Sequence, residues 1–457
     1  MSVLEDRSAP DGRRLKLAVA ILKSLSQSPR PDPIVWLAGG PGGALVARAP
    51  EFVRSGLLDG WRADRDVILY DQRGAGLSEP RLCPEEAANW QGQPGREDQL
   101  AFRARRREVA ARCRESVGRA GFNLSQYNSA VSALDLQDLR RALGYTQWNL
   151  YGPSYGGRLA LVAMRDAPEG IRSAIVAAPI PPPNVAWWAS RPASVVDVVH
   201  RLSAACAAQP ACDAAFPNVE QTFWRNVEAF DREPWTLQLA LPNGRRQTLK
   251  ITGTMAAGLG LNGLPIRAGL VTFPMRVHAV RARDETLINA LLASTLPAQD
   301  ADDNAASQAM HHAVQCFEEA PLNTPDLYEN ARRSYPRVLL DGGLFAEPSI
   351  CEHLHPFRAS SAQLAEVRSD IPTLIVTGEF DPLAHRSYGP IIQRSLPNSQ
   401  LAEIRGATHN GGGHRDYECT RKMTRDFLNA PMQKLDRSCL EAIPPLQFVT
   451  DVKAIVR

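Results

Sequence analysis

Residues 148–157 read Trp-Asn-Leu-Tyr-Gly-Pro-Ser-Tyr-Gly-Gly. The first four residues form a short apolar run typical of a buried strand, and an alanine-rich segment with a helical pattern follows at 157–165. Between the two lies G-x-S-x-G, a spacing that predicts a serine in a sharp strand-to-helix turn, with its hydroxyl exposed above the sheet edge. The flanking glycines let the two backbones approach because glycine has no Cβ atom. Ser154 is therefore the candidate nucleophile.

Composition limits the class of protein. The chain has 457 residues, of which 44% are hydrophobic and 22% charged, as in a globular protein with a large core. The net charge of +3 is too small to indicate nucleic-acid binding, and the basic run at 103–107 is predicted to be the solvated face of a helix. No run approaches the roughly 20 apolar residues of a membrane span. The sequence therefore predicts neither a nucleic-acid partner nor a membrane span.

The eight cysteines indicate in which cellular compartment the protein resides. None forms C-x-x-C, which argues against a zinc or thioredoxin-like site. Taken in sequential pairs they predict the disulfides 83–113, 206–212, 316–351 and 419–439, and buried free thiols are the alternative. Disulfides favour a periplasmic or secreted protein. The polar segment 1–14 lacks the apolar part of a signal peptide, so either a leader has been removed or the protein is cytoplasmic.

Short apolar runs alternate with helical patterns along most of the chain. Predicted strands are 15–22, 34–38, 67–70, 174–178, 373–377 and 401–404, and predicted helices are 98–117, 129–143 and 421–428. Within the second helix, Ser132 and Asp135 resemble a helix start. Strands that alternate with helices predict an α/β fold with a mainly parallel sheet.

The pattern changes after residue 180, where a mostly helical segment with a possible hairpin at 235–251 interrupts the strands. The predicted domains are therefore 1–180 as the first part of the core, 181–368 as an inserted, mostly helical cap domain, and 369–457 as the second part of the core with a C-terminal tail.

A serine needs a base to take its proton and an acid to orient that base. Asp381 follows the predicted strand 373–377 and is the candidate acid, with Glu379 as the second choice. His409 follows the strand 401–404 and is the candidate base, with His414 as the second choice.

The glycine-rich loop at 39–43 follows the first buried strand and does not match the phosphate-binding patterns. It is predicted to supply one N–H to an oxyanion hole, from Gly40 first or Gly42 second, beside the N–H of Tyr155. The cysteine and histidines at 351–355 could bind a metal in principle. No metal or cofactor is predicted, because this chemistry needs neither.

Five short motifs occur in order along the chain. They are Gly-Gly-Pro-Gly-Gly at 39–43, Asp-Gln-Arg-Gly-Ala-Gly-Leu-Ser at 71–78, Gly-Pro-Ser-Tyr-Gly-Gly at 152–157, Gly-Glu-Phe-Asp-Pro at 378–382 and Gly-Ala-Thr-His at 406–409. With them the chain resembles the proline iminopeptidase family of α/β-hydrolases, and most of all its secreted tripeptidyl-aminopeptidase-like branch. The resemblance covers about 30–180 and 370–435. It implies Ser154 as nucleophile, Asp381 as acid and His409 as base, in agreement with the placement above. Two positions depart from the family pattern, Ala38 where a histidine is usual and Asn410 where a glycine is common.

The resemblance also implies a function for the insert. In this family a helical cap roofs the site, and acidic cap residues can hold the free amine of a substrate. Glu318 and Glu319 are the candidates, and solvated acids on a helix are the alternative. The predicted function is a serine hydrolase that acts through an acyl-enzyme on short peptides with a free N-terminus, as a proline iminopeptidase or tripeptidyl aminopeptidase does. A carboxylesterase on the same triad and a non-catalytic binding protein are the alternatives. The sequence does not indicate an oligomeric state.

Overall fold

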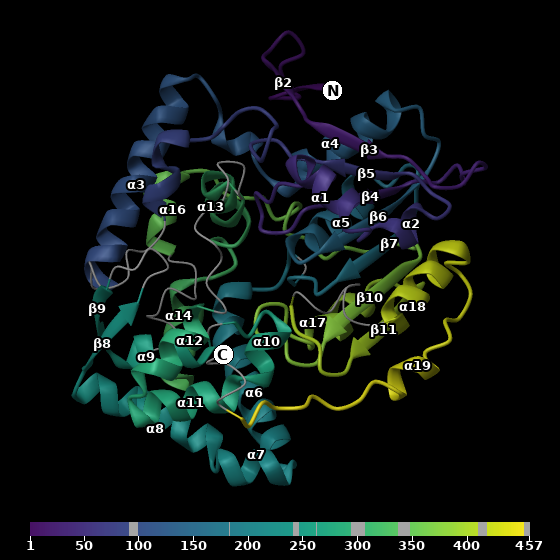
Figure 1. The fold of residues 1–457 in the computed structure, drawn as a ribbon. Helices are drawn as coiled ribbons and strands as arrows, with labels where there is room; N and C mark the ends of the chain where they lie inside the picture. The colour runs from purple at the N-terminus through teal and green to yellow at the C-terminus, as the bar shows by residue number, and fades with distance from the viewer. Residues whose placement is uncertain are drawn as a thin grey trace.

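The centre of the fold is a seven-stranded sheet in the order β11-β10-β7-β6-β4-β5-β3 (Figure 1). Its strands are β3 (Val19–Leu22), β4 (Ile34–Trp36), β5 (Val67–Tyr70), β6 (Trp148–Pro153), β7 (Ile171–Ala177), β10 (Thr373–Gly378) and β11 (Ser399–Ile404). Every neighbouring pair in this sheet is parallel except β3 with β5. The prediction of a mainly parallel α/β sheet is confirmed. The computed structural model describes residues 1–90, 99–181, 183–240, 246–261, 263–293, 307–336, 348–409 and 418–451.

The prediction of one early strand at 15–22 is wrong. β2 (Arg14–Lys16) pairs with β1 (Ser2–Leu4) in a separate two-stranded sheet, and β3 begins only at Val19. The chain changes partners between the two strands, where the Leu17 N–H donates to the Met1 carbonyl and the Ala18 N–H to the Ser78 hydroxyl. Burial alternates over 14–17 and then becomes intermediate over 18–21. The apolar residues continue through the change because a residue pattern reports which positions are buried and not which strand is the partner.

Helices cover both faces of the central sheet (Figure 1). Those outside the insert are η1 (Val46–Arg48), α1 (Ala49–Arg54), α2 (Asp59–Arg62), η2 (Pro84–Trp90), α3 (Gln99–Arg119), η3 (Leu124–Gln126), α4 (Ser129–Ala142), α5 (Tyr155–Asp166), α17 (Tyr388–Gln393), α18 (Glu418–Asn429) and α19 (Ser438–Glu441). Helix α4 begins at Ser129 as predicted, but the resemblance of Ser132 and Asp135 to a helix start is misleading. Asn128 caps this helix by accepting from the Val131 N–H at 3.0 Å, and Asp135 lies buried inside it, where its carboxylate binds Arg73 at 2.7 Å. The short polar side chain at 135 therefore serves a tertiary ion pair and not a cap.

The basic run at 103–107 lies on α3 and is not wholly solvated, contrary to the prediction. Arg107 is exposed, but Arg106 is buried and its Nη2 atom lies 2.9 Å from Nε2 of His312. Since consecutive residues of a helix point in different directions, a run of five contains positions that face the protein.

The insert between β7 and β10 is mostly helical, as predicted. It contains α6 (Trp187–Ala207), α7 (Pro210–Ala215), α8 (Val219–Arg232), α9 (Gly253–Leu261), α10 (Arg267–Val271), α11 (Phe273–Ala282), α12 (Glu285–Ala293), α13 (Gln308–Glu318), α14 (Pro325–Ser334) and α16 (Pro348–Leu354). The predicted hairpin is present as β8 (Trp235–Ala240) paired antiparallel with β9 (Arg246–Ile251), and its turn lies outside the described residues. Helices α6 to α12 bury a hydrophobic cluster that is separate from the clusters around the sheet. The boundaries at 181 and 368 remain predictions.

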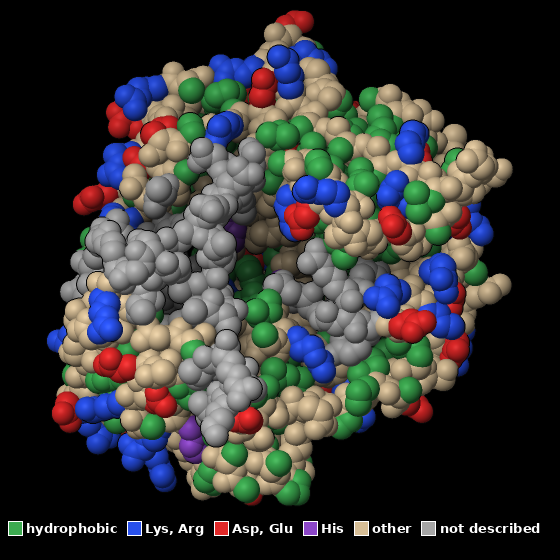
Figure 2. Space-filling view, in the orientation of Figure 1, with side chains coloured by type: hydrophobic (Ala, Val, Ile, Leu, Met, Phe, Trp, Pro, Cys, Tyr) green, Lys and Arg blue, Asp and Glu red, His purple; other side chains and the backbone are tan. Residues whose placement is uncertain are grey.

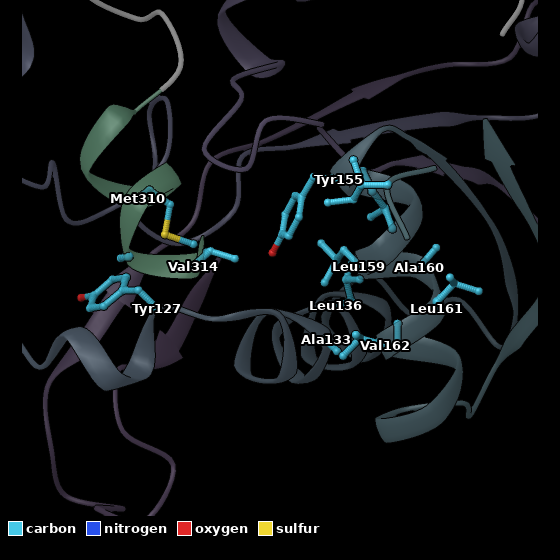
Figure 3. Close-up of a cluster of buried hydrophobic side chains, with 14 of the residues drawn as sticks. Tyr127, Ala133, Leu136, Tyr155, Leu159, Ala160, Leu161, Val162, Met310 and Val314 are labelled. Atoms are coloured by element: carbon cyan, nitrogen blue, oxygen red, sulfur yellow. The ribbon is translucent and has the colours of Figure 1, made fainter. Parts of the chain in front are cut away.

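One hydrophobic cluster joins the core to the insert (Figure 3). Tyr155 and Leu159 of α5 pack with Leu136 of α4 and lie near Met310 and Val314 of α13. The helix that follows Ser154 is therefore held from the core on one side and from the insert on the other.

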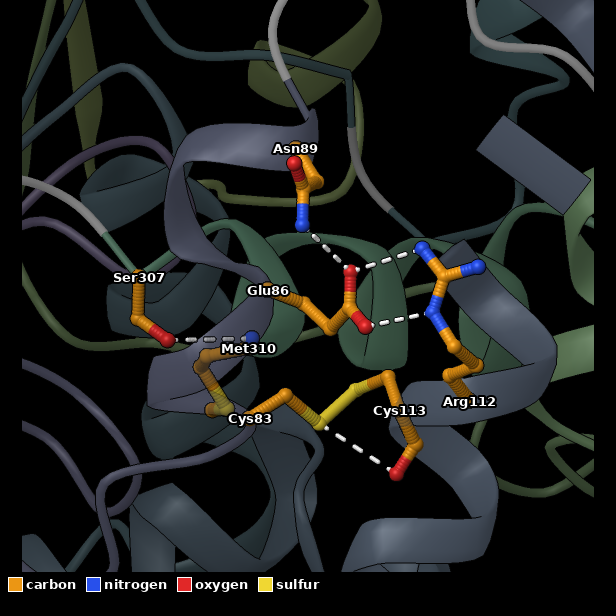
Figure 4. The surroundings of a disulfide bond; sticks show 7 residues. All are labelled: Cys83, Glu86, Asn89, Arg112, Cys113, Ser307 and Met310. Atoms are coloured by element: carbon orange, nitrogen blue, oxygen red, sulfur yellow. Dashed lines mark hydrogen bonds and ion pairs between the residues drawn. A yellow bond between two sulfur atoms is a disulfide. The ribbon is translucent and has the colours of Figure 1, made fainter. Parts of the chain in front are cut away.

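All eight cysteines form the four predicted disulfides, Cys83–Cys113, Cys206–Cys212, Cys316–Cys351 and Cys419–Cys439. The first bond joins Cys83, just before η2, to α3, and Glu86 and Arg112 add an ion pair between the same elements with a 2.9 Å contact (Figure 4). Disulfides persist in oxidising compartments, so this framework indicates an extracellular or periplasmic protein. In the described ranges, no helix combines the length and the apolar character that crossing a membrane requires.

We expect the double variant Cys419→Ala/Cys439→Ala to be less stable than the wild type by about 3 kcal/mol, because the bond closes a loop of about 20 residues in the unfolded chain. Urea denaturation of both proteins measures the difference. Thiol titration of the unreduced wild type is the companion experiment, and eight reactive thiols would show that the bonds do not form.

Candidate active site

Ser154 occupies the turn between β6 and α5. Its backbone angles are φ 57° and ψ −125°, a conformation that costs a residue with a side chain about 1–3 kcal/mol. The surroundings hold this conformation, since the Ser154 N–H donates to the Ala177 carbonyl at 2.9 Å and its own carbonyl accepts from Gly157 at 2.9 Å. A Cβ atom on Gly152 would overlap the Gly156 carbonyl. The predicted strand-to-helix turn is thus present, and its glycine at 152 is sterically required.

Asp381 and His409 lie in the loops that follow the neighbouring strands β10 and β11. Asp381 Oδ2 is 2.9 Å from His409 Nδ1, the acid is fully buried, and the histidine side chain is 11% exposed. The other oxygen of Asp381, Oδ1, accepts the N–H groups of Leu383 and Ala384, each at 2.8 Å. Both carboxylate oxygens are therefore used, and one of them faces the imidazole.

Glu379 and His414 are the second choices for the acid and for the base. Glu379 does not pair with His409: its carboxylate binds Arg201 at 3.0 Å and accepts the Gly406 N–H at 2.8 Å. His414 and Asn410 lie outside the described residues.

The insert supports the loop that carries His409. Arg267 of α10 donates to the Gly406 carbonyl at 3.2 Å, and the Thr408 hydroxyl donates to the Leu264 carbonyl at 2.5 Å. Arg201 of α6 reaches the same loop through Glu379. Sequence reasoning missed these residues because the partners are more than a hundred positions apart and no local pattern marks them.

The glycine loop 39–43 lies against the nucleophile turn. A Cβ atom built on Gly39 would be 3.1 Å from Cβ of Ser154. Gly40 has φ 115° and Gly42 φ 86°, values that L side chains rarely adopt. The structure therefore brings this loop together with Ser154, which Tyr155 follows as the first residue of α5. The Tyr155 side chain is buried and its hydroxyl is 2.8 Å from the Ser129 hydroxyl.

Glu318 and Glu319 are both buried, so the alternative of solvated acids is wrong. Glu319 forms an ion pair with Arg158 and accepts the Trp187 N–H at 3.2 Å and the Asn323 amide at 3.1 Å. Its Oε1 atom is used by the ion pair, and its Oε2 atom by the two hydrogen bonds.

Glu318 has fewer contacts. Its Oε1 atom accepts the Ser129 N–H at 2.7 Å, and its Oε2 atom is 3.8 Å from Nη1 of Arg158. Burial raises the pKa of the Glu318 carboxyl, and Arg158 opposes that effect. Two carboxylates therefore share one buried guanidinium. Sequence reasoning missed Arg158, although its position four residues after Ser154 put it on the same side of α5.

Two members of the cluster at 351–355, the cysteine and the second histidine, have other partners. Cys351 is bonded to Cys316, and the ring nitrogens of His355 lie 2.9 Å from the Leu124 carbonyl and 3.1 Å from the Phe357 carbonyl. A disulfide sulfur and a histidine with both nitrogens occupied do not form a metal site.

Comparisons with known proteins agree with this architecture. Residues 32–215 match the family described as alpha/beta hydrolase fold, and residues 342–439 match the family described as TAP-like protein. The tripeptidyl aminopeptidase of Streptomyces lividans is 32% identical over 197 residues, which cover 41% of this chain and 36% of the relative. The proline iminopeptidase of Arabidopsis thaliana is 27% identical over 157 residues, which cover 33% and 28%.

The matched segments thus span about a third of the length of these relatives. A solved structure titled proline iminopeptidase from Mycobacterium smegmatis aligns over 92% of this chain and 96% of its own, with 14% identity and a TM-score of 0.42. The chain has the α/β-hydrolase fold, and the relatives that it matches in sequence include tripeptidyl aminopeptidases and proline iminopeptidases.

Proposed function

We propose that this protein is a serine aminopeptidase that releases residues from the free N-terminus of short peptides through an acyl-enzyme. The Ser154 hydroxyl attacks the scissile carbonyl, while His409 takes its proton and returns it to the leaving amine. Asp381 holds the imidazole with its proton on Nδ1. The N–H of Tyr155 and an N–H of the glycine loop, from Gly40 or Gly42, stabilise the oxyanion. Water then attacks the acyl-enzyme and releases the N-terminal product.

The observation that carries the peptidase assignment is the charge balance around Arg158. One guanidinium faces two buried carboxylates, Glu318 and Glu319, so one negative charge has no partner of opposite sign among these three groups. The ammonium group of a free N-terminus supplies one positive charge and three hydrogen-bond donors. A buried carboxylate that gains such a partner becomes more favourable in its ionised form.

Glu318 is the better candidate of the two acids for binding the amine. Neither Glu318 Oε2 nor Glu319 Oε1 accepts a hydrogen bond from the part of the chain that the structure describes, but Glu319 Oε1 is in close ion-pair contact with Arg158, whereas Glu318 Oε2 lies 3.8 Å from Nη1 of Arg158. The other oxygen of Glu319 accepts the Trp187 N–H and the Asn323 amide. In this proposal Glu319 fixes Arg158, and Glu318 binds the substrate.

We also propose that the enzyme acts outside the cytoplasm, in the periplasm or as a secreted protein. The four disulfides support this compartment, since they stabilise a chain only where thiols are oxidised. Short peptides in that space are its substrates.

The test compares wild type with Ser154→Ala on a matched panel. The panel holds amino-acid and tripeptide arylamides with free or acetylated N-termini, together with a short-chain aryl ester. We expect release from the free amides that depends on Ser154 and is lost on acetylation. Hydrolysis of the ester alone would identify a carboxylesterase on the same triad, and the absence of labelling by a serine-reactive phosphonate would identify a protein that only binds its ligand.

A further inference from the structure

Helix α13 of the insert begins directly on the glycine loop. Ser307 caps this helix, because its hydroxyl accepts the Met310 N–H at 3.2 Å (Figure 4). The Ser307 N–H donates to the Gly42 carbonyl at 2.8 Å. The two backbones are in close contact, and a Cβ atom on Gly42 would overlap the Ser307 carbonyl. The first turn of α13 and the loop beside Ser154 are therefore one packed unit.

His311 adds a side-chain contact to this unit. Its Nδ1 atom lies 3.3 Å from the carbonyl oxygen of Pro41, and its ring meets the ring of His312 edge to face at 5.1 Å. A carbonyl oxygen only accepts hydrogen bonds, so the Nδ1 atom must carry the proton. Desolvation lowers the pKa of His311 to about 4, which keeps the imidazole neutral near pH 7.

The geometry of the peptide unit links this contact to catalysis. The Pro41 carbonyl and the Gly42 N–H belong to one planar peptide unit, so a donor that holds the carbonyl also sets the direction of the N–H. The Gly39 carbonyl and the Gly40 N–H form another such unit, and the Gly43 N–H holds that carbonyl at 3.1 Å. The loop thus fixes the direction of the Gly40 N–H through its own hydrogen bond, whereas the direction of the Gly42 N–H depends on a contact from α13.

We infer that His311 is a positioning residue for the oxyanion hole, which it supports by donating from Nδ1 to the Pro41 carbonyl. The inference rests on the proposed serine hydrolase function. The same helix carries Glu318 at its last residue, so α13 joins the oxyanion loop to the proposed amine site. His311 does not touch the substrate in this arrangement. It acts through the orientation of the glycine loop.

The experiment measures kcat and KM of His311→Ala and His311→Asn on the substrate of the panel that wild type cleaves best. We expect His311→Ala to lower kcat about 10- to 100-fold with KM changed less than about twofold, because a misdirected oxyanion donor affects the transition state more than the bound substrate. The asparagine amide can donate from nearly the same position as Nδ1, so His311→Asn is expected to recover most of kcat.

The matched control is His312→Gln on the same helix. His312 is buried against the Trp90 ring at 4.7 Å and near Arg106. Its ring meets the His311 ring, but among the described residues the ring contact to the Pro41 carbonyl comes from His311. We expect this control to lower the thermal midpoint and to keep kcat within about twofold of wild type, which separates loss of stability from loss of positioning.

Three outcomes would overturn the inference alone: a wild-type kcat in His311→Ala, equal losses in the alanine and asparagine variants, or an equal loss of kcat in His312→Gln. A wild type that hydrolyses no member of the panel would instead refute the proposed function. Circular dichroism of each variant confirms that the proteins compared are folded.

Discussion

Replacing Asp381 by asparagine is expected to lower kcat by roughly 10⁴-fold with little change in KM. The reason lies in how the two carboxylate oxygens are used. Oδ1 accepts two backbone N–H groups, from Leu383 and Ala384, and Oδ2 faces Nδ1 of His409. An amide at this position keeps its oxygen toward the backbone donors, so its NH₂ group faces the imidazole. The histidine then holds its proton on Nε2 and cannot accept one from Ser154.

The matched control for this experiment is Glu379→Gln. Glu379 is the other acid of the same loop, but it binds Arg201 and the Gly406 N–H and not the imidazole. We expect it to lower kcat less than about tenfold, because it supports the His409 loop without touching the base and its ion pair is partly exposed. Initial rates on a free-N-terminus arylamide measure both variants. A larger loss in Glu379→Gln than in Asp381→Asn would show that the acid is misassigned.

The placement of these residues was predictable because of the topology of parallel sheets. Ser154, Asp381 and His409 each follow a buried strand, and parallel strands that are neighbours end at one edge of the sheet. A residue after such a strand therefore lies near the others, however far apart they are in the chain. The structure places Asp381 against His409 at this edge, as the strand positions predicted.

Other features depend on partners that no local pattern reveals. The Thr408 hydroxyl binds a carbonyl at Leu264, and Ser129 at the start of α4 binds Glu318 at the end of α13. The misleading resemblance of Ser132 and Asp135 to a helix start has the same origin, since Asp135 inside the helix pairs with Arg73 of a distant loop. Tertiary ion pairs and hydrogen bonds use the same residue types as local caps, so the two cannot be separated by sequence spacing alone.

The Glu318→Gln variant is expected to lose about 10- to 100-fold of the preference for free over acetylated N-termini. A hydrogen bond between charged groups contributes about 1.5–3 kcal/mol, which corresponds to that range. The measurement is the ratio of kcat/KM for the free and the acetylated peptide arylamide, in wild type and in the variant. Because the ratio compares two substrates of one protein, partial inactivation of the variant does not affect it.

The same variant is expected to be no less stable than wild type at pH 7. Burial raises the pKa of Glu318 in the folded protein above its unfolded value, so the ionised carboxylate costs stability, and the wild type becomes more stable as the pH falls through the folded pKa. Glutamine removes that dependence and still accepts the Ser129 N–H through its amide oxygen. Urea denaturation at pH 7 and at pH 5 should therefore show wild type gaining stability relative to the variant at the lower pH.

Glu319→Gln is the matched control, because it alters the neighbouring buried acid, which is proposed to hold Arg158 and not to bind the substrate amine. Glu319 holds Arg158, the Trp187 N–H and the Asn323 amide, so its replacement weakens a buried ion pair and should cost about 3 kcal/mol of stability. The preference for free N-termini should fall less than in Glu318→Gln. If Glu318→Gln keeps the wild-type preference while Glu319→Gln loses it, the substrate amine binds Glu319, and if neither variant loses it, the buried acids serve the fold alone.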